Sequence, residues 1–302
     1  TVSLKERHSG REYSLRARFL VGADGAKSKV AEDIGLPIEG HMARAGTVYV
    51  IFKADLSRYV AHRPSILHWI VTPAASFGEI GMGLLRAVRP WHTWIAGWGF
   101  DISRGDPDLS PACLLDRIRT LVGDPELEVT IERSSVWYVN QAYATEYARG
   151  RVFCGGDAVH RHPPSSGLGL NTCVQDAFNL AWKLAYVIQG HAGPQLLATY
   201  SAERAPVGRQ IVLRANQSRL DYAPLKAAFR VDGADNPVAA GIARFRDPGP
   251  DGVAARKAVQ AALALKNTEF NAQGVEMNQR YTSTAVGPDP AAGEEVWRRD
   301  PQ

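Results

Sequence analysis

The most constraining feature of this sequence is a short apolar strand that ends in a glycine–aspartate turn, and it occurs twice. The first copy is Leu20-Val21-Gly22-Ala23-Asp24-Gly25, and the second is Val152-Phe153-Cys154-Gly155-Gly156-Asp157. In open α/β sheets, ligands bind at the carboxyl ends of the strands. Glycine lets the backbone approach a bulky ligand, and a carboxylate accepts hydrogen bonds from sugar hydroxyls. Either turn alone is weak evidence, because a Gly-Asp pair after a strand is more commonly a plain turn.

The segment after the second turn strengthens the prediction of a ligand site. It reads His162-Pro163-Pro164-Ser165-Ser166-Gly167-Leu168-Gly169-Leu170-Asn171 and runs into a helix expected from about Leu170 to Gln189. A rigid Pro-Pro step, a flexible Gly-x-Gly and a helix start would aim unpaired backbone N–H groups at one point. Such a helix N-terminus stabilises negative charge.

The rest of the chain predicts a β-rich block between the two turns and helices after the second. Apolar periodicity predicts helical core stripes at Leu114, Leu115, Ile118 and Leu121, and again at Val174, Phe178, Ala181, Ala185 and Ile188. The expected elements are a hairpin within 1–22, a helix at 28–34, strands at 47–52, 65–71, 79–86 and 91–100, a helix at 110–122, a strand pair at 127–141, a strand at 151–154, a helix at 194–220 bent at Pro206, and a surface excursion at 230–255.

Composition limits the class of protein and the kind of partner. The 302 residues are 45% hydrophobic and 22% charged, as in ordinary globular chains. The net charge of +4 comes from dispersed basic residues, which favours anionic cofactors and not nucleic acid. Cys113, Cys154 and Cys173 form no Cys-x-x-Cys pair, so we expect a reducing cytoplasm. The sequence contains neither an apolar run of about 18 residues nor a signal peptide, so we do not expect a membrane as a partner.

These motifs together resemble the class A flavoprotein monooxygenases, which have the p-hydroxybenzoate hydroxylase fold. The resemblance is carried by Gly156-Asp157-Ala158-x-His160-x-x-Pro163-Pro164-x-x-Gly167-x-Gly169-x-Asn171, and by the Ala23–Ser28 turn. Segments 58–65, 89–91, 152–154 and 274–281 are similar to the chlorophenol and phenol hydroxylase branch. The likeness covers about 1–225 and 270–285.

The resemblance implies a mixed α/β (α+β) fold, the FAD-binding p-hydroxybenzoate-hydroxylase-like fold without its N-terminal Rossmann βαβ unit. Residues 1–40 and 141–225 would form part of the FAD-binding domain, and 41–140 an inserted, mainly antiparallel substrate-binding sheet. Residues 226–302 would be a C-terminal extension leading toward a missing thioredoxin-like domain. The chain opens at Thr1 without a methionine, so we expect a strand–Gly-x-Gly-x-x-Gly–helix unit upstream.

The function that the resemblance implies is an FAD-dependent, NADPH-using hydroxylation of a phenol by O₂, through a flavin C4a-hydroperoxide. A chlorophenol such as 2,4-dichlorophenol is the expected substrate. One alternative is a polyketide or polycyclic aromatic hydroxylase of the same family. Another is that the isolated chain is inactive and binds FAD weakly. Neither nucleic acid nor a membrane is expected as a partner, and a homo-oligomer stays open.

The same resemblance assigns cofactor-binding residues but no catalytic base, which would lie in the missing N-terminal part. Asp157, with Gly156 and Ala158, would hold the ribityl chain and pyrophosphate. The amides of Leu170 and Asn171 would face the electron-rich edge of the flavin. The full set of expected cofactor-binding residues is Asp24, Gly25, Gly156, Asp157, Ala158, Pro164, Gly167, Gly169, Leu170 and Asn171.

Other readings of this region are less favoured. His160 and His162 lie in a Pro-rich loop without suitably spaced partners, so no metal site is predicted. A Gly-x-Ser-x-Gly nucleophile elbow would need glycine where Pro163 and Pro164 stand. Asp176 and Asn179 are interpreted as structural residues that hold the loop and the helix start.

Overall fold

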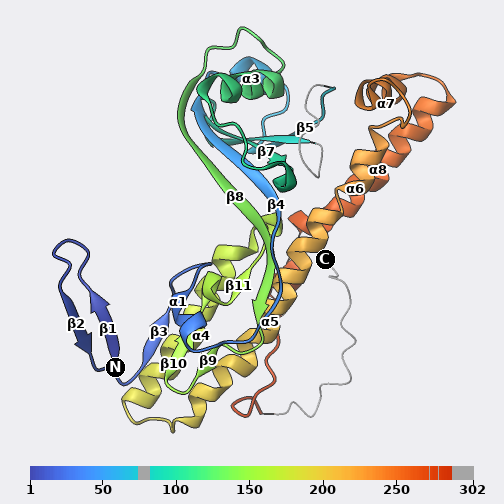
Figure 1. Cartoon of the computed structure of the whole chain (residues 1–302). Coiled ribbons are helices and arrows are strands. Elements are labelled where there is room, and N and C mark those ends of the chain that lie inside the picture. The colour runs from blue at the N-terminus through green and yellow to red at the C-terminus, as the bar shows by residue number, and fades with distance from the viewer. Residues whose placement is uncertain (74–81, 272, 278, 288–302) are drawn as a thin grey trace. The chain divides into compact units, whose positions relative to one another are not determined.

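A computed structural model describes residues 1–73, 82–271, 273–277 and 279–287, and Figure 1 shows its elements. The chain folds into two compact units. Unit 1 contains residues 1–41, 141–216 and 271–302, and unit 2 contains 42–140 and 217–270. The functional assignment of domains made from the sequence stays a prediction. None of the helices in the described part of the chain has the length and apolar character that a membrane crossing requires.

Unit 1 is built on a small sheet in which the two glycine–aspartate strands are neighbours. β3 (Leu20–Gly22) pairs in parallel with β10 (Val152–Cys154), with Cys154 opposite Gly22, and β9 (Ala148–Arg149) pairs antiparallel with β10. The other strands are β1 (Val2–Lys5) and β2 (Glu12–Leu15), which form the expected hairpin, and β11 (His160–Arg161). The helices are α1 (Lys29–Asp33), α4 (Leu168–Ile188), most of α5 (Gln195–Leu220) and α9 (Gln273–Met277).

The core of unit 1 lies between this sheet and helices α1, α4 and α5. Phe153 and Cys154 of β10 are buried there against Ala31, Leu180 and Tyr200. The predicted helix at 28–34 is confirmed as α1. It starts after Ser28, because the Ser28 side chain accepts a hydrogen bond from the Ala31 amide and caps the helix.

Unit 2 is built on an antiparallel sheet in the order β8-β4-β7-β6-β5, and α3 packs against it (Figure 1). Val48, Phe52 and Trp94 of the sheet are fully buried with Ile118 of α3. The bounds are β4 (Ile38–Lys53), α2 (Ser57–Val60), β5 (Leu67–Ile70), β6 (Gly83–Arg89), β7 (Thr93–Phe100), α3 (Pro111–Val122), β8 (Thr130–Ala144), α6 (Ala223–Ala228), α7 (Pro237–Arg246) and α8 (Pro250–Phe270).

Two predictions of secondary-structure elements need correction, and one more begins outside the described residues. Residues 127–141 do not form a strand pair but enter one strand, β8, because 130–144 contains no Gly or Pro to turn the chain. The surface excursion expected at 230–255 contains α7 and the start of α8, each of which begins with a proline. The strand expected at 79–86 begins at residues outside the described part of the chain. From Gly83 onward it corresponds to β6.

A further correction concerns the face that α4 buries. Val174, Phe178 and Ile188 were predicted to pack in the core, yet they are 59%, 74% and 50% exposed. The buried face of α4 consists mainly of polar residues: Leu168, Thr172, Asp176, Asn179, Leu180 and Lys183. These polar groups are buried because each finds a charged or hydrogen-bonding partner within unit 1.

Candidate cofactor site

The parallel pairing of β3 and β10 brings the two glycine–aspartate turns to the same edge of the sheet. The Gly155 amide donates to the Gly22 carbonyl over 3.1 Å, directly after the last paired residues. Both strands therefore deliver their turns at neighbouring carboxyl ends, the position at which open α/β sheets bind ligands. The structure thus brings together the region of Asp24 and Gly25 and the region of Gly156, Asp157 and Ala158.

The first turn is ordered by its own carboxylate. Asp24 accepts a hydrogen bond from the Ser28 hydroxyl over 2.5 Å and from the Val30 amide over 3.1 Å. Partial burial opposes ionisation, but these hydrogen bonds outweigh it and hold the pKa of Asp24 below its ordinary value. Asp24 therefore stays ionised while it supports the start of α1.

The second turn presents an exposed carboxylate from a tightly packed backbone. Gly156 has φ of +64°, a left-handed conformation that favours glycine, and a Cβ there would lie 3.1 Å from the Cys173 sulfur. Ala158 is buried, whereas the Asp157 side chain is exposed to solvent. The Cys173 thiol lies 3.8 Å from Asp157 Oδ1, so the turn rests against α4.

Arg161, which the sequence analysis did not select, brings a positive charge to the same turn. Its guanidinium donates to the carbonyl oxygens of Asp157 and Ala158, each over 2.9 Å. Burial lowers the pKa of Arg161, and the negative charges of Asp157 and Asp24 oppose that shift. Its place directly after the Gly-Asp-Ala segment was the signal available in the sequence.

The segment from Pro164 to Gly167 leads into α4 through the left-handed Gly167. Gly167 has φ of +65° and is the N-cap of the helix, and its amide donates to the Pro164 carbonyl over 3.0 Å. A helix that begins at Leu168 leaves the first amides, including those of Gly169 and Leu170, without partners inside the helix. Leu170 and Asn171 are both exposed, and the Asn171 side chain donates to the Gly167 carbonyl over 3.1 Å.

Three side chains beside the second turn could in principle hold a metal ion. The ligand atoms of Asp157, His160 and Cys173 lie within 4.8 Å of one another. His160 Nε2, however, lies 2.8 Å from Asp176 Oδ2, and burial together with the charge of Asp157 raises the pKa of the Cys173 thiol to about 11. In the structure Cys173 contacts the turn and His160 contacts Asp176. The sequence analysis predicted no metal site here, and that stays a prediction.

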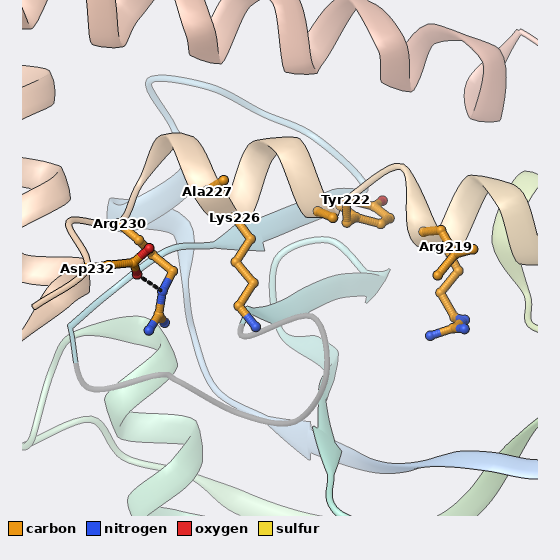
Figure 2. Close-up of a pocket in the computed structure, with 8 residues that line it drawn as sticks. Arg219, Tyr222, Lys226, Ala227, Arg230 and Asp232 are labelled. Atoms are coloured by element: carbon orange, nitrogen blue, oxygen red, sulfur yellow. Dashed lines mark ion pairs between the residues drawn. The ribbon is translucent and has the colours of Figure 1, made fainter.

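Unit 2 contains a separate cavity of about 310 Å³ along α5 and α6. Figure 2 shows that the side chains of Arg219, Lys226 and Arg230 extend from the same side of these helices, and that Arg230 faces Asp232. The residues that line the cavity are Arg219, Leu220, Tyr222, Ala223, Lys226, Ala227, Arg230 and Asp232. None of them belongs to the glycine–aspartate turns, and we assign the cavity no function.

Comparison with known proteins gives a consistent result across most of the chain. The family model described as "FAD binding domain" matches residues 1–215. The chain is 49% identical over 291 residues to 2,4-dichlorophenol 6-monooxygenase of Delftia acidovorans, covering 96% of this chain and 50% of that protein. It is 45% identical over 293 residues to phenol 2-monooxygenase of Pseudomonas sp. (strain EST1001), covering 96% and 46%.

A solved structure supports the same assignment. The flavin-dependent monooxygenase PieE, in complex with FAD and substrate, matches with a TM-score of 0.89 and 39% identity, covering 99% of this chain and 51% of that one. The chain therefore spans about half the length of the relatives that it matches. Since the family model covers more than half of the sequence and the fold agrees, this chain belongs to the FAD binding domain family.

Proposed function

We propose that the chain is part of an FAD-dependent, NADPH-using aromatic hydroxylase that acts on a phenol. The observation that carries the proposal is the parallel pairing of β3 and β10, which places both glycine–aspartate turns at one sheet edge. The similarity to 2,4-dichlorophenol 6-monooxygenase and phenol 2-monooxygenase supports a phenolic substrate, with 2,4-dichlorophenol as our first choice. One oxygen atom of O₂ would enter the ring beside the hydroxyl, the other would leave as water, and NADPH would supply two electrons.

The residues at the sheet edge fit the chemical groups of FAD. Asp157 offers an exposed carboxylate to sugar hydroxyls, and the left-handed Gly156 allows close approach of the backbone. The guanidinium of Arg161 supplies positive charge near a pyrophosphate. FAD, when bound, supplies the oxygen-activating chemistry, and the protein supplies binding, orientation and electrostatics.

The start of α4 would stabilise the electron-rich edge of the flavin ring. Amides at Leu170 and Asn171 lie in the first turn of a 21-residue helix whose dipole favours negative charge at this end. Gly167 and Gly169 keep side chains out of this approach, and Pro164 would form a wall. Gly25 and Asp24 would contact the cofactor from the neighbouring strand. Residues 41–140 are proposed as the substrate-binding part.

Titration of the purified chain with FAD tests the cofactor half of this proposal. Quenching of flavin fluorescence should saturate at one FAD per chain, and Asp157→Ala should weaken binding roughly tenfold because a charged hydrogen-bond acceptor is lost. Asp33→Ala, an exposed carboxylate on α1, is the matched control and should bind FAD as the unmodified chain does. Equal affinities for both variants would remove Asp157 from the site.

A chimaera tests the reaction itself. This chain would replace the matching half of the Delftia acidovorans relative, which then supplies the remaining sequence. We expect 2,4-dichlorophenol-dependent oxidation of NADPH and a dichlorocatechol product, with the unmodified relative as the positive control. A folded, yellow chimaera that hydroxylates a polycyclic phenol but not 2,4-dichlorophenol would contradict the substrate assignment.

A further inference from the structure

A buried network of charges connects the second glycine–aspartate turn to a segment more than a hundred residues later in the chain. Its centre is Asp176 of α4, which is almost fully buried. Asp176 Oδ2 accepts from the Gly156 amide over 3.0 Å and lies 2.8 Å from His160 Nε2. Its other oxygen, Oδ1, accepts from Nε of Arg204 over 2.7 Å. One carboxylate therefore joins the turn, β11 and α5.

Arg204 of α5 links this carboxylate to the C-terminal part of unit 1. The guanidinium is fully buried, and its Nη1 donates to Gln279 Oε1 and to the Tyr281 hydroxyl, each over 2.9 Å. Gln279 also donates to Gln175 Oε1 over 2.8 Å, and Gln175 accepts from Arg204 Nη2 over 3.3 Å. The planar guanidinium uses several donors in fixed directions, which an ammonium group cannot reproduce.

A second buried charge pair lies beside the first and reaches the same segment. Glu203 Oε2 accepts from Lys183 Nζ over 2.6 Å and from Asn179 over 2.7 Å. Its Oε1 accepts from the Ser283 hydroxyl over 2.8 Å. The segment 279–283 is thus bound at three side chains to the consecutive residues Glu203 and Arg204, and we call it the C-terminal strap.

We propose that Arg204 is a positioning residue for the Gly156–Asp157 turn, acting through Asp176, and that the C-terminal strap holds Arg204 in place for this role. The proposal rests on the proposed function only in taking this turn as part of the FAD site. The Asp176 carboxylate needs a fixed orientation to accept from the Gly156 amide with one oxygen, and Arg204 sets that orientation by holding the other. Loss of a strap contact should therefore loosen the turn without touching it.

Cys173 provides a reporter of the turn that does not require FAD. Its sulfur lies 3.8 Å from Asp157 Oδ1, and a Cβ added at Gly156 would lie 3.1 Å from it. A loosened turn would therefore expose the thiol. Cys113 of α3 is also partly exposed but belongs to unit 2, and Cys154 is buried. Alkylation by iodoacetamide, followed by peptide mass spectrometry, gives the Cys173 rate with Cys113 as the internal reference.

Two substitutions test the role at different strengths. Arg204→Lys keeps the positive charge but loses the planar guanidinium with its several donors. It should raise the Cys173 alkylation rate roughly tenfold, with the Cys113 rate unchanged. Tyr281→Phe removes one neutral acceptor for Arg204 and should raise the Cys173 alkylation rate roughly threefold. Tyr186→Phe, an exposed tyrosine of α4 outside the network, is the matched control. If Arg204→Lys fails to fold, Tyr281→Phe and Gln279→Leu carry the test.

The outcomes separate this proposal from the proposed function. A faster Cys173 rate in the strap variants supports positioning, and FAD affinity should fall by a similar factor in the same variants. An unchanged Cys173 rate in folded variants with lowered melting temperatures would show a purely structural network and overturn the proposal. If alkylation responds as expected but the chimaera with the Delftia acidovorans relative neither binds FAD nor shows protection of Cys173 by FAD, positioning stands and the proposed function fails.

Discussion

Helices α3 and α4 show similar apolar stripes in the sequence but bury opposite kinds of side chain. In α3, Leu114, Ile118 and Leu121 lie in the core of unit 2, as their spacing predicts. In α4, the apolar Phe178 is exposed, while the charged Asp176 and Lys183 are buried. The apolar pattern that identifies a core face in one helix therefore fails in a helix next to a ligand-binding turn.

The difference follows from what each helix packs against. α3 lies on apolar sheet residues such as Val50 and Phe52, so burial of hydrocarbon is its main source of stability. α4 packs a polar face on His160 of β11 and on Glu203 and Arg204 of α5, with which its buried charged residues form pairs. Buried pairs of this kind add modest net stability but fix one geometry, which is a requirement for a cofactor site.

The largest effect should come from removing the central carboxylate of α4. Asp176→Ala leaves the buried guanidinium of Arg204 and the Gly156 amide without their acceptor. Breaking a buried pair from one side costs about 3–5 kcal/mol of the free energy of unfolding. Urea titration followed by circular dichroism measures it, with the exposed Asp33→Ala as control. A loss equal to that of Asp33→Ala would mean that the network does not hold unit 1 together.

The corresponding change in α3 should cost somewhat less and should have no effect on the turn. Ile118→Ala removes a fully buried side chain from the unit 2 core and should cost about 2–4 kcal/mol by loss of transfer energy and cavity formation. The alkylation rate of Cys173, in unit 1, should not change. If Ile118→Ala raised the Cys173 rate as strongly as Asp176→Ala, the contrast between the two helices would be lost.

Several strands, turns and helix starts could be predicted because their signals are local. Ser28 caps α1, and the glycine–aspartate turns end short apolar strands, as expected from the sequence. The two copies of one motif identified both strands, but their parallel pairing was not predicted and comes from the structure. The cofactor roles of Asp157, Leu170 and Asn171 stay predictions, because they depend on the family resemblance and on a ligand.

The buried polar network could not be predicted because its partners are far apart in the sequence. Asp176, Arg204 and Tyr281 are ordinary polar residues until the fold places them in contact. The exposed stripe of α4 shows the same limit, since periodicity finds an apolar face but not what covers it. Helices α7 and α8 were missed because proline and glycine were interpreted as loop signals, although Pro237 and Pro250 begin the helices.

Acid should weaken the polar face of α4 by a moderate amount. Burial opposes ionisation of Asp176 and Glu203, but their hydrogen bonds and ion pairs outweigh it and hold the pKa of each below its ordinary value. Their stabilising contribution is complete above the unfolded pKa of about 4 and is lost as pH falls through the lower folded pKa values.

Glu203→Gln provides the control for this pH dependence, because it removes one titrating group at the same position. Melting temperatures measured between pH 7 and pH 3 should fall less steeply for this variant than for the unmodified chain. Parallel curves would show that Glu203 contributes nothing to the acid sensitivity, and the Lys183–Glu203 pair would then count as a weak contact despite its 2.6 Å distance.

The smallest effect is expected where the apolar pattern is most misleading. Phe178 is 74% exposed on α4, so Phe178→Ser removes little buried surface and should change the free energy of unfolding by no more than about 0.5 kcal/mol. Leu180→Ala, two residues away on the buried face, should cost about 2–4 kcal/mol. Urea titrations of both variants give the comparison. A large loss for Phe178→Ser would mean that this stripe packs in the core in solution, as its periodicity predicts, and that the polar face of α4 is not the main source of its stability.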